Sequence, residues 1–178
     1  VNTLSQASPQ AKDAFTAAGK KYTDQLEDLD KWASDSMSAV PEQDRVLFSS
    51  HDAFGYFSNA YGVKFIGSAL SDFNNQQDAT SRHIDEQAKQ IRESGAKAIF
   101  AENSNSSKSI EAIARAAGVK AVTSDDALYG DSLGVPGSEG ETYIGSIVHN
   151  INTLVSAWDS EQQPLPESLQ AFDVAKRK

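Results

Sequence analysis

The 178-residue sequence contains no cysteine, which excludes disulfide bonds, thiolate metal ligands and cysteine nucleophiles. It also lacks any apolar run near the roughly 18 residues that a membrane-spanning helix needs. Basic residues are in the minority, because 16 Lys and Arg stand against 25 Asp and Glu, for a formal net charge of −9. Nucleic-acid binding depends on neutralising phosphates with basic side chains, so this balance disfavours DNA and RNA as partners.

Several common motifs are missing as well. No G-x-x-x-x-G-K-[ST] or G-x-S-x-G segment occurs, and the glycines at 134, 137 and 140 do not match G-x-G-x-x-G. The P-loop, nucleophile-elbow and dinucleotide-binding signatures are therefore absent. What is present is 39% hydrophobic residues, enough for the core of one domain with a helical appendage.

Residues 8–40 have the pattern of one long amphipathic helix. Ser8 is a suitable N-cap, Pro9 suits the first helical position, and Pro41 would end the helix. Apolar residues recur every three or four positions and form one stripe. They are Phe15, Ala18, Tyr22, Leu26, Leu29, Ala33 and Met37. A helix well above the average of about 11–12 residues is expected to extend beyond one domain or to lean against another part.

Strand and helix patterns then alternate along the chain. The expected strands cover 46–48, 63–66, 98–101 and 119–122, and the expected helices cover 54–61, 78–94, 106–117 and 143–158. Asp78 is expected to cap the second of these helices, and Gly95 to end it. Such alternation indicates an α/β fold with a parallel four-stranded sheet flanked by helices, preceded by the long helix. We expect a linking helix over 1–41, a lobe over 42–160 and a loosely ordered tail over 161–178.

Polar residues stand where the expected strands end, which is where an open parallel sheet binds its ligands. His51 follows the first strand and Glu102 follows the third. The loop after the fourth strand carries Asp125, Asp126 and Asp131. One imidazole and two carboxylates at one edge of the sheet suit a divalent cation. They leave a coordination position for water, a substrate or a ligand from another domain.

Each candidate ligand also has a structural interpretation. His51 could lie at the start of a helix, where the aspartate after it would stabilise the positive end of the helix dipole. Glu102 could be a solvated loop residue, and Asp131 could be a turn former in a glycine-rich loop. Two further histidines are expected on helices, His83 as an exposed residue and His149 as an exposed or interhelical one.

Three separate segments resemble the metal-binding segments of the manganese/zinc receptors of bacterial ABC importers. They are SHDAFGYF at 50–57 with YG at 61–62, AIFAEN at 98–103, and LYGDSLG at 128–134. ETYI at 141–144, with Asn150, resembles the terminal helix of that family, and the opening helix with LEDLD at 26–30 resembles the rigid helix that joins its two lobes. The resemblance extends from residue 10 to about 160, and three motifs in the same order are more specific than any one of them.

The resemblance implies that His51, Glu102 and Asp131 are metal ligands. Mn(II) is the preferred ion and Zn(II) the second choice, because a Glu/Asp pair beside one histidine suits Mn(II) while further imidazoles favour Zn(II). The resemblance also implies a solute-binding protein, not an enzyme, which binds the metal between two lobes and delivers it to an ABC permease. The implied location is extracytoplasmic, in the periplasm or at the cell surface, with a lipid anchor from a leader outside this sequence.

In that family an amino-terminal lobe precedes the linking helix and supplies a further histidine. We therefore expect this chain to be the carboxy-terminal lobe and linking helix of a longer protein, with an incomplete metal site. Metal release is expected to depend on movement of the loop 124–140. Gly130, Gly134, Gly137 and Gly140 would give that loop conformational freedom.

An enzyme is the main alternative. One histidine and two carboxylates around an open position also resemble a metal-dependent hydrolase or a non-haem iron site. However, the sequence places no further His or Lys as an obvious general base, and a non-haem iron triad needs a second histidine. A third alternative is an interaction module in which the acidic residues form a solvated face.

Overall fold

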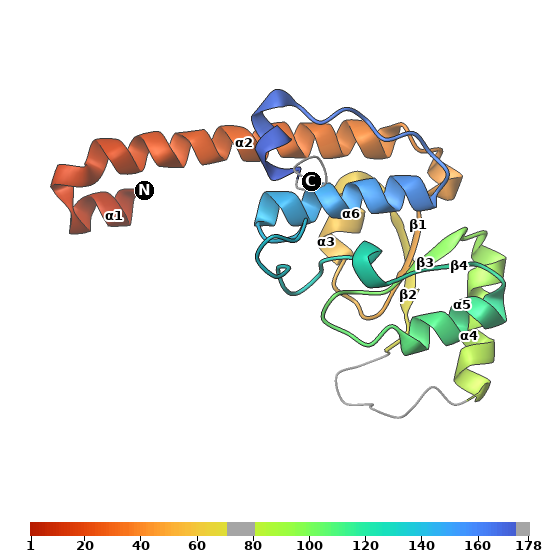
Figure 1. The fold of residues 1–178 in the computed structure, drawn as a ribbon. Helices are drawn as coiled ribbons and strands as arrows, with labels where there is room; N and C mark the ends of the chain where they lie inside the picture. The colour runs from red at the N-terminus through yellow and green to blue at the C-terminus, as the bar shows by residue number, and fades with distance from the viewer. Residues whose placement is uncertain (71–80, 174–178) are drawn as a thin grey trace.

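The computed structural model describes residues 1–70 and 81–173 (Figure 1). Its elements are α1 (Asn2–Ala7), η1 (Pro9–Ala11), α2 (Lys12–Ser38), η2 (Glu42–Asp44), β1 (Val46–Ser49), α3 (Gly55–Tyr61), β2 (Lys64–Ser68), α4 (Ser81–Ser94), β3 (Ala98–Phe100), α5 (Lys108–Ala117), β4 (Lys120–Val122), η3 (Ser124–Asp126), α6 (Tyr143–Ala157) and η4 (Glu167–Phe172). The predicted α/β alternation after a long helix is confirmed. The predicted helix cap at Asp78 lies outside the described residues.

The long helix begins later than the apolar pattern predicted. The chain first forms α1 and then leaves the helical conformation at Ser8, which has φ −140° and ψ 80°. Pro9 opens the short 3-10 helix η1 instead of the long helix. The ring of a proline clashes with a helical conformation of the residue before it, which explains this break. From Lys12 the helix α2 runs for 27 residues and ends before Pro41, as predicted.

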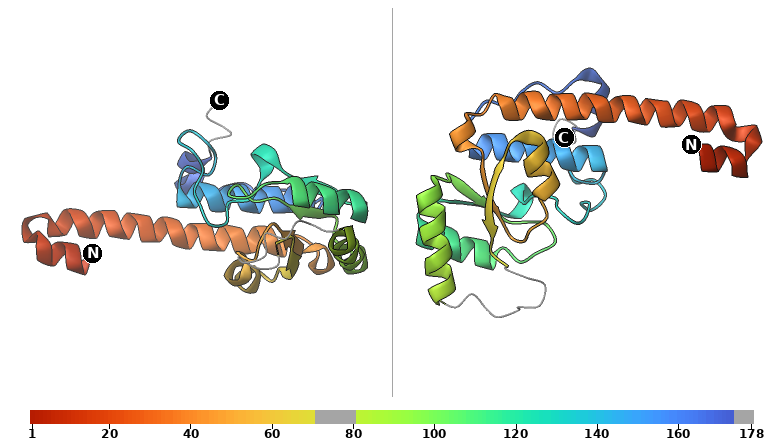
Figure 2. Two further views of the ribbon diagram at one scale, coloured as in Figure 1. Left: turned by 90° about the horizontal axis from the view of Figure 1, so that it is seen from below. Right: turned by 180° about the vertical axis from the view of Figure 1, so that it is seen from behind.

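Only the second half of α2 packs on the rest of the lobe. Its buried residues all lie from Leu29 onward, whereas Tyr22 is 45% exposed. The first half projects past the lobe, and α1 folds back beside it (Figures 1 and 2). The helix therefore extends beyond one domain, as its length predicted. Although α2 is long, no helix in the described parts of the chain is also apolar enough to cross a membrane.

The four strands are parallel but form two pairs instead of the predicted continuous sheet. β1 pairs with β2, and β3 pairs with β4. β1 lies beside β3 (Figure 1), yet the described residues form no backbone ladder between them. One physical reason is that the Val46 carbonyl in β1 accepts a hydrogen bond from the indole N–H of Trp158, at 3.2 Å. That carbonyl is thus bound by a side chain and not by a neighbouring strand.

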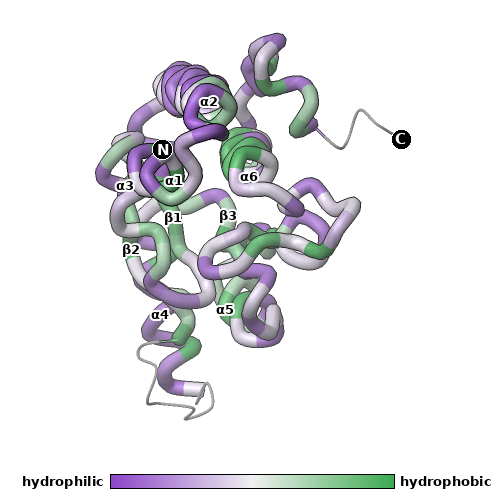
Figure 3. The backbone as a smooth tube through the Cα atoms, turned by 90° about the vertical axis from the view of Figure 1, so that its left-hand side faces the viewer, coloured by the Kyte–Doolittle hydropathy of each residue, from purple (hydrophilic) through white to green (hydrophobic). Residues whose placement is uncertain are grey.

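Helices cover both faces of the strands, and alternate strand residues enter two cores. Leu47 and Phe100 pack with side chains of α2 and α6. Phe48 and Ile99, each one residue away, pack with side chains of α4 and α5. Successive residues of a strand point to opposite faces, so burial on both faces explains the continuously apolar strands in the sequence. In Figure 3, where the tube is coloured by residue hydropathy, α6 is more hydrophobic than the projecting α2.

The described chain after α6, up to residue 173, packs onto α2, whereas the sequence suggested a loosely ordered tail over 161–178. Residues 174–178 of that predicted tail lie outside the described part. The carbonyl of Gln163 accepts a hydrogen bond from Trp32 Nε1 at 3.3 Å. Ser168 Oγ donates to Asp28 Oδ2 at 2.6 Å. Within η4, Leu169 is completely buried in the core formed by α2 and α6. The prolines in this segment prevent a regular helix, but they do not prevent one leucine from reaching an apolar site.

Tyr61 supports a test of the link between α3 and α2. Its phenol donates to Asp30 Oδ1 at 3.0 Å, and burial together with this hydrogen bond raises the pKa of Tyr61, so the phenol keeps its proton. We expect Tyr61→Phe to lower the free energy of unfolding by about 0.5–1.5 kcal/mol in urea denaturation. Tyr56→Phe is the control, because Tyr56 is 96% exposed. Equal losses in the two variants would contradict the role of this hydrogen bond.

Candidate metal-binding site

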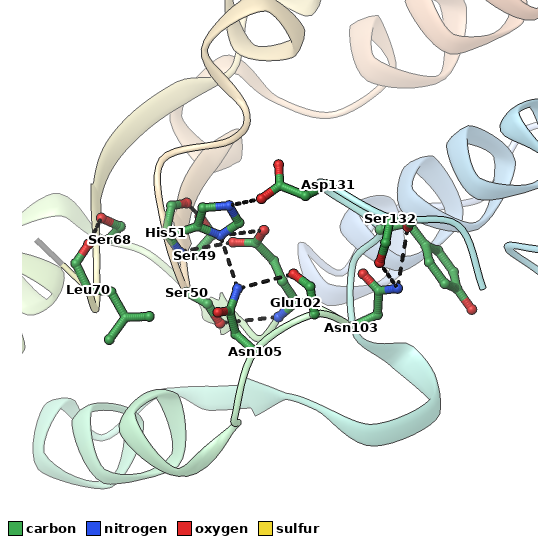
Figure 4. A network of polar contacts seen from close by, with 12 residues as sticks. Ser49, Ser50, His51, Ser68, Leu70, Glu102, Asn103, Asn105, Asp131 and Ser132 are labelled. Atoms are coloured by element: carbon green, nitrogen blue, oxygen red, sulfur yellow. Dashed lines mark hydrogen bonds and ion pairs between the residues drawn. The ribbon is translucent and has the colours of Figure 1, made fainter. Parts of the chain in front are cut away.

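The parallel neighbours β1 and β3 end at the same edge of the lobe, and each is followed by one predicted ligand. His51 lies two residues after the end of β1, and Glu102 lies two residues after the end of β3. The N–H of Glu102 donates to Ser50 Oγ at 3.2 Å, and the N–H of His51 donates to Glu102 Oε1 at 3.0 Å (Figure 4). These reciprocal hydrogen bonds join the two strand ends and bring the imidazole beside the carboxylate.

Asp131 reaches the same edge through an additional bridge beyond β4. Leu128 forms an isolated parallel β-bridge with Glu102, and the Leu128 N–H donates to the carbonyl of Ala101 at 2.9 Å. The N–H of Asn103 in turn donates to the carbonyl of Leu128 at 2.9 Å. Asp131 follows three residues later. The chain after η3 thus continues the β3 edge, and this carries Asp131 to the end of the neighbouring strand.

The imidazole of His51 lies between the two predicted carboxylate ligands (Figure 4). Its Nδ1 is 2.8 Å from Glu102 Oε2, and its Nε2 is 2.5 Å from Asp131 Oδ2. The three residues therefore meet in one cluster, but the carboxylates contact different ring nitrogens, whose lone pairs diverge. Across 1–70 and 81–173, no three His, Cys, Asp or Glu side chains are arranged to hold one metal ion.

The two carboxylates have different environments. The side chain of Glu102 is 0% exposed, whereas that of Asp131 is 55% exposed. Burial raises the pKa of the Glu102 carboxyl, and the hydrogen bond from the His51 N–H opposes that shift. Asp131 is therefore the most exposed member of the cluster, while the His51 side chain between the two carboxylates is 12% exposed. Glu102 is placed behind the ring, where a carboxylate typically orients a metal-binding histidine.

Close packing explains the glycine at position 130. A Cβ there would lie 2.5 Å from Glu102 Oε2 and 3.3 Å from the Cβ of Ala53. The sequence suggested that the four loop glycines provide conformational freedom, but among them only Gly137 has a positive φ, of 85°. Gly130 instead leaves space for the buried carboxylate. The loop is therefore better described as packed against the site than as freely flexible.

The other candidate residues lie outside this cluster. Asp125 and Asp126 are exposed in η3, and His83 lies on α4. His149 on α6 is 5% exposed, so it is neither an exposed residue nor a member of the cluster. Its Nδ1 lies 2.8 Å from Glu139 Oε2 in the loop before α6.

Sequence reasoning missed one neighbour of the imidazole. The side-chain amide of Asn105 lies 3.2 Å from His51 Nδ1. The signal that could have identified it is its position in the loop after β3, only three residues beyond Glu102. This polar loop encloses the Nδ1 side of the ring and leaves the Nε2 side for Asp131.

Comparisons with known proteins all point to metal-binding proteins. A family model described as the periplasmic zinc-uptake complex component A (ZnuA) matches residues 1–157. The manganese-binding lipoprotein MntA of Bacillus subtilis is 41% identical over 156 residues, which cover 86% of this chain and 50% of that protein. The zinc-binding protein TroA of Treponema pallidum is 35% identical over 145 residues, which cover 80% of this chain and 46% of that protein.

A solved structure gives the same relationship. The periplasmic zinc-binding protein TroA from Treponema pallidum superposes with a TM-score of 0.77 at 32% identity. The superposition covers 90% of this chain and 57% of that one. The chain thus spans about half the length of the curated relatives it matches.

Proposed function

The chain belongs to the periplasmic zinc-uptake component A (ZnuA) family, and from that premise we propose that it forms part of the receptor of a divalent-metal ABC importer. The receptor binds Mn(II) or Zn(II) between two lobes, outside the cytoplasm, and delivers it to a membrane permease. The observation that carries the proposal is the accessible Asp131 carboxylate beside His51 Nε2, at the edge where three separate family motifs converge. A lipid anchor and an amino-terminal lobe would come from the rest of a longer chain.

Two side chains of this lobe would bind the ion directly. With a cation bound by Asp131 and Nε2, Glu102 beside Nδ1 would hold the ring proton on Nδ1, which leaves the Nε2 lone pair for the metal. Asp131 would supply an oxygen ligand from the same side. Glu102 would act through His51, which modifies the prediction of three direct ligands. Two ligands leave coordination positions for water and for the other lobe, which would supply the further histidine implied by the resemblance.

The donor set favours Mn(II) as the cargo, with Zn(II) as its competitor. Carboxylate oxygens suit Mn(II), while each additional imidazole favours Zn(II). Zn(II) nevertheless binds more tightly than Mn(II) at most sites of a given geometry. Tight zinc binding in vitro would therefore be compatible with manganese as the transported ion.

Calorimetric titration of the full-length protein with Mn(II) and with Zn(II) tests the proposal. We expect Asp131→Ala to weaken both affinities by at least about tenfold, because the ion loses an oxygen ligand. Asp126→Ala is the matched control, since Asp126 is an exposed aspartate in the nearby η3. Unchanged affinity in the Asp131 variant would overturn the assignment of this ligand.

Glu102→Gln distinguishes a supporting residue from a direct ligand. The amide N–H₂ facing Nδ1 would reverse the tautomer and place the ring proton on Nε2, where it blocks metal binding. We expect a loss of affinity of about 10–100-fold. The circular dichroism spectrum of the metal-free variant should stay the same across the pH range. An imidazole nitrogen NMR spectrum of the metal-free protein would report the tautomer. An unchanged tautomer together with lost affinity would instead indicate that Glu102 binds the ion itself.

The receptor interpretation can also be separated from the hydrolase alternative. The relatives named above are metal-binding proteins of solute-receptor type, which favours a protein without catalytic activity. The full-length protein loaded with metal should show no turnover of generic esters or phosphoesters. Turnover that disappears with Asp131→Ala would support the enzyme alternative.

A further inference from the structure

The main chain of Tyr129, two residues before Asp131, is held by a single side chain from α6. Asn150 Oδ1 accepts a hydrogen bond from the Tyr129 N–H at 2.9 Å, and Asn150 Nδ2 donates to the Tyr129 carbonyl at 2.8 Å. Asn150 is 1% exposed, so water cannot easily replace these bonds. The buried amide satisfies both main-chain groups of Tyr129 and thereby defines the position of the loop relative to α6.

The ring of Tyr129 is enclosed by its own loop and by α6. A Cβ at Gly140 would overlap the ring, and a Cβ at Gly134 would lie 3.0 Å from it. On α6, the ring of His149 makes an edge contact with that of Tyr129, with 4.9 Å between centroids and 70° between planes. Two of the loop glycines therefore serve to let the chain approach this ring. The loop has a small packed centre, and Tyr129 is that centre.

Adjacent residues of α6 hold the loop on both sides of the candidate ligand. His149 Nε2 lies 3.0 Å from the carbonyl oxygen of Ala127, and Nδ1 lies 2.8 Å from Glu139 Oε2. Ala127 precedes Asp131 and Glu139 follows it. Together with the bonds from Asn150, these contacts tie the start, the middle and the end of the loop to one turn of α6.

A second anchor lies directly after the ligand. Asn103 Nδ2 donates to Ser132 Oγ at 2.9 Å and approaches the carbonyl of Ser132 at 3.3 Å (Figure 4). Asp131 is therefore bracketed between Tyr129, which is held by α6, and Ser132, which is held by the loop after β3. The main chain around Asp131 is thus held on both sides, while its carboxylate, which is 55% exposed, contacts His51 Nε2.

We propose that Tyr129 and Asn150 are positioning residues for Asp131 and that they set the metal affinity of the site. This inference rests on the proposed function. Asn150 fixes the Tyr129 backbone, the packed ring fixes the rest of the loop, and the carboxylate is thereby held beside His51 Nε2.

A thermodynamic cycle in the full-length protein tests this inference with Mn(II) as the titrant. Asn150→Leu removes both hydrogen bonds at similar volume and is expected to weaken the affinity by about tenfold or more. Asn152→Leu is the matched control, since it makes the same change on the same helix, but Asn152 lines a pocket together with Gln162 and Pro164 of the segment after α6. In an Asp131→Ala background, Asn150→Leu should cause no further loss, because it acts only through Asp131.

A variant at the ring provides an independent arm if Asn150→Leu does not fold. Gly140→Ala, which crowds the ring, should weaken the affinity. If Asp131→Ala alone leaves the affinity unchanged, the proposed function fails. The positioning role is overturned if Asp131→Ala weakens binding but Gly140→Ala and any folded Asn150 variant do not. It is also overturned if the affinity losses of the Gly140 and Asn150 variants persist in full in the Asp131→Ala background.

Discussion

Replacing His51 by Ala in the full-length protein is expected to lower the affinity for Mn(II) and Zn(II) by about 100-fold or more. The imidazole contacts both carboxylates, so its loss would remove a proposed direct ligand and separate Glu102 from the site. A direct ligand should matter more than a residue that only supports one, for which losses of about 10–100-fold are typical. Calorimetry, with a competing chelator for the tight complexes, measures the change.

The structure allows this loss to be separated from damage to the fold. The hydrogen bond from position 51 to Glu102 Oε1 comes from the main chain, so alanine retains it and the ends of β1 and β3 stay joined. His83→Ala is the matched control, because it removes a histidine from α4, away from the cluster. Similar affinities for the two variants would show that His51 is not a ligand.

Replacing Trp158 by Ala is expected to lower the free energy of unfolding by about 3–5 kcal/mol. Trp158 is completely buried at the end of α6 and meets Phe100 of β3 edge-to-face, with 6.3 Å between ring centroids. Its indole N–H also satisfies the buried carbonyl of Val46 in β1. Truncation would therefore leave a cavity among three elements and an unpaired acceptor beside it. Urea denaturation of the metal-free protein measures the loss.

A conservative variant divides this effect into its two parts. Trp158→Phe keeps most of the apolar volume but leaves the Val46 carbonyl without its donor, so a loss of about 1–3 kcal/mol is expected. Tyr22→Ala, at a half-exposed position on the projecting part of α2, is the control for loss of an aromatic ring. A Trp158→Ala variant as stable as this control would show that the core tolerates the cavity.

The elements themselves were largely predictable, and the errors have identifiable causes. The helices and strands followed from periodicity, since burial on one or two faces leaves a repeat in the sequence. The late start of α2 also had a signal, because Pro9 disfavours a helical conformation at Ser8. The packing of Leu169 had none, because one leucine shortly after two prolines carries no apolar period.

The candidate site was predictable only in its membership. The rule that ligands lie at the carboxyl ends of parallel strands identified His51, Glu102 and a loop with three aspartates, from which the family resemblance selected Asp131. In the structure Glu102 and Asp131 each contact the imidazole of His51. The rule could not assign them different roles, because it contains no information on which ring nitrogen each carboxylate faces. It also could not identify Tyr129 and Asn150, whose contacts join segments far apart in the chain.

The sequence by itself determined the α/β class, the long helix, the family resemblance and the set of residues at the strand ends. These properties depend on local patterns or on motifs, and both can be read along one chain. Only the tertiary structure decided that the strands form two pairs, that the imidazole separates the two carboxylates, and that the loop glycines fit around Tyr129 and Glu102. Such features depend on distances between atoms remote in the chain, and these distances exist only after the helices and strands have packed.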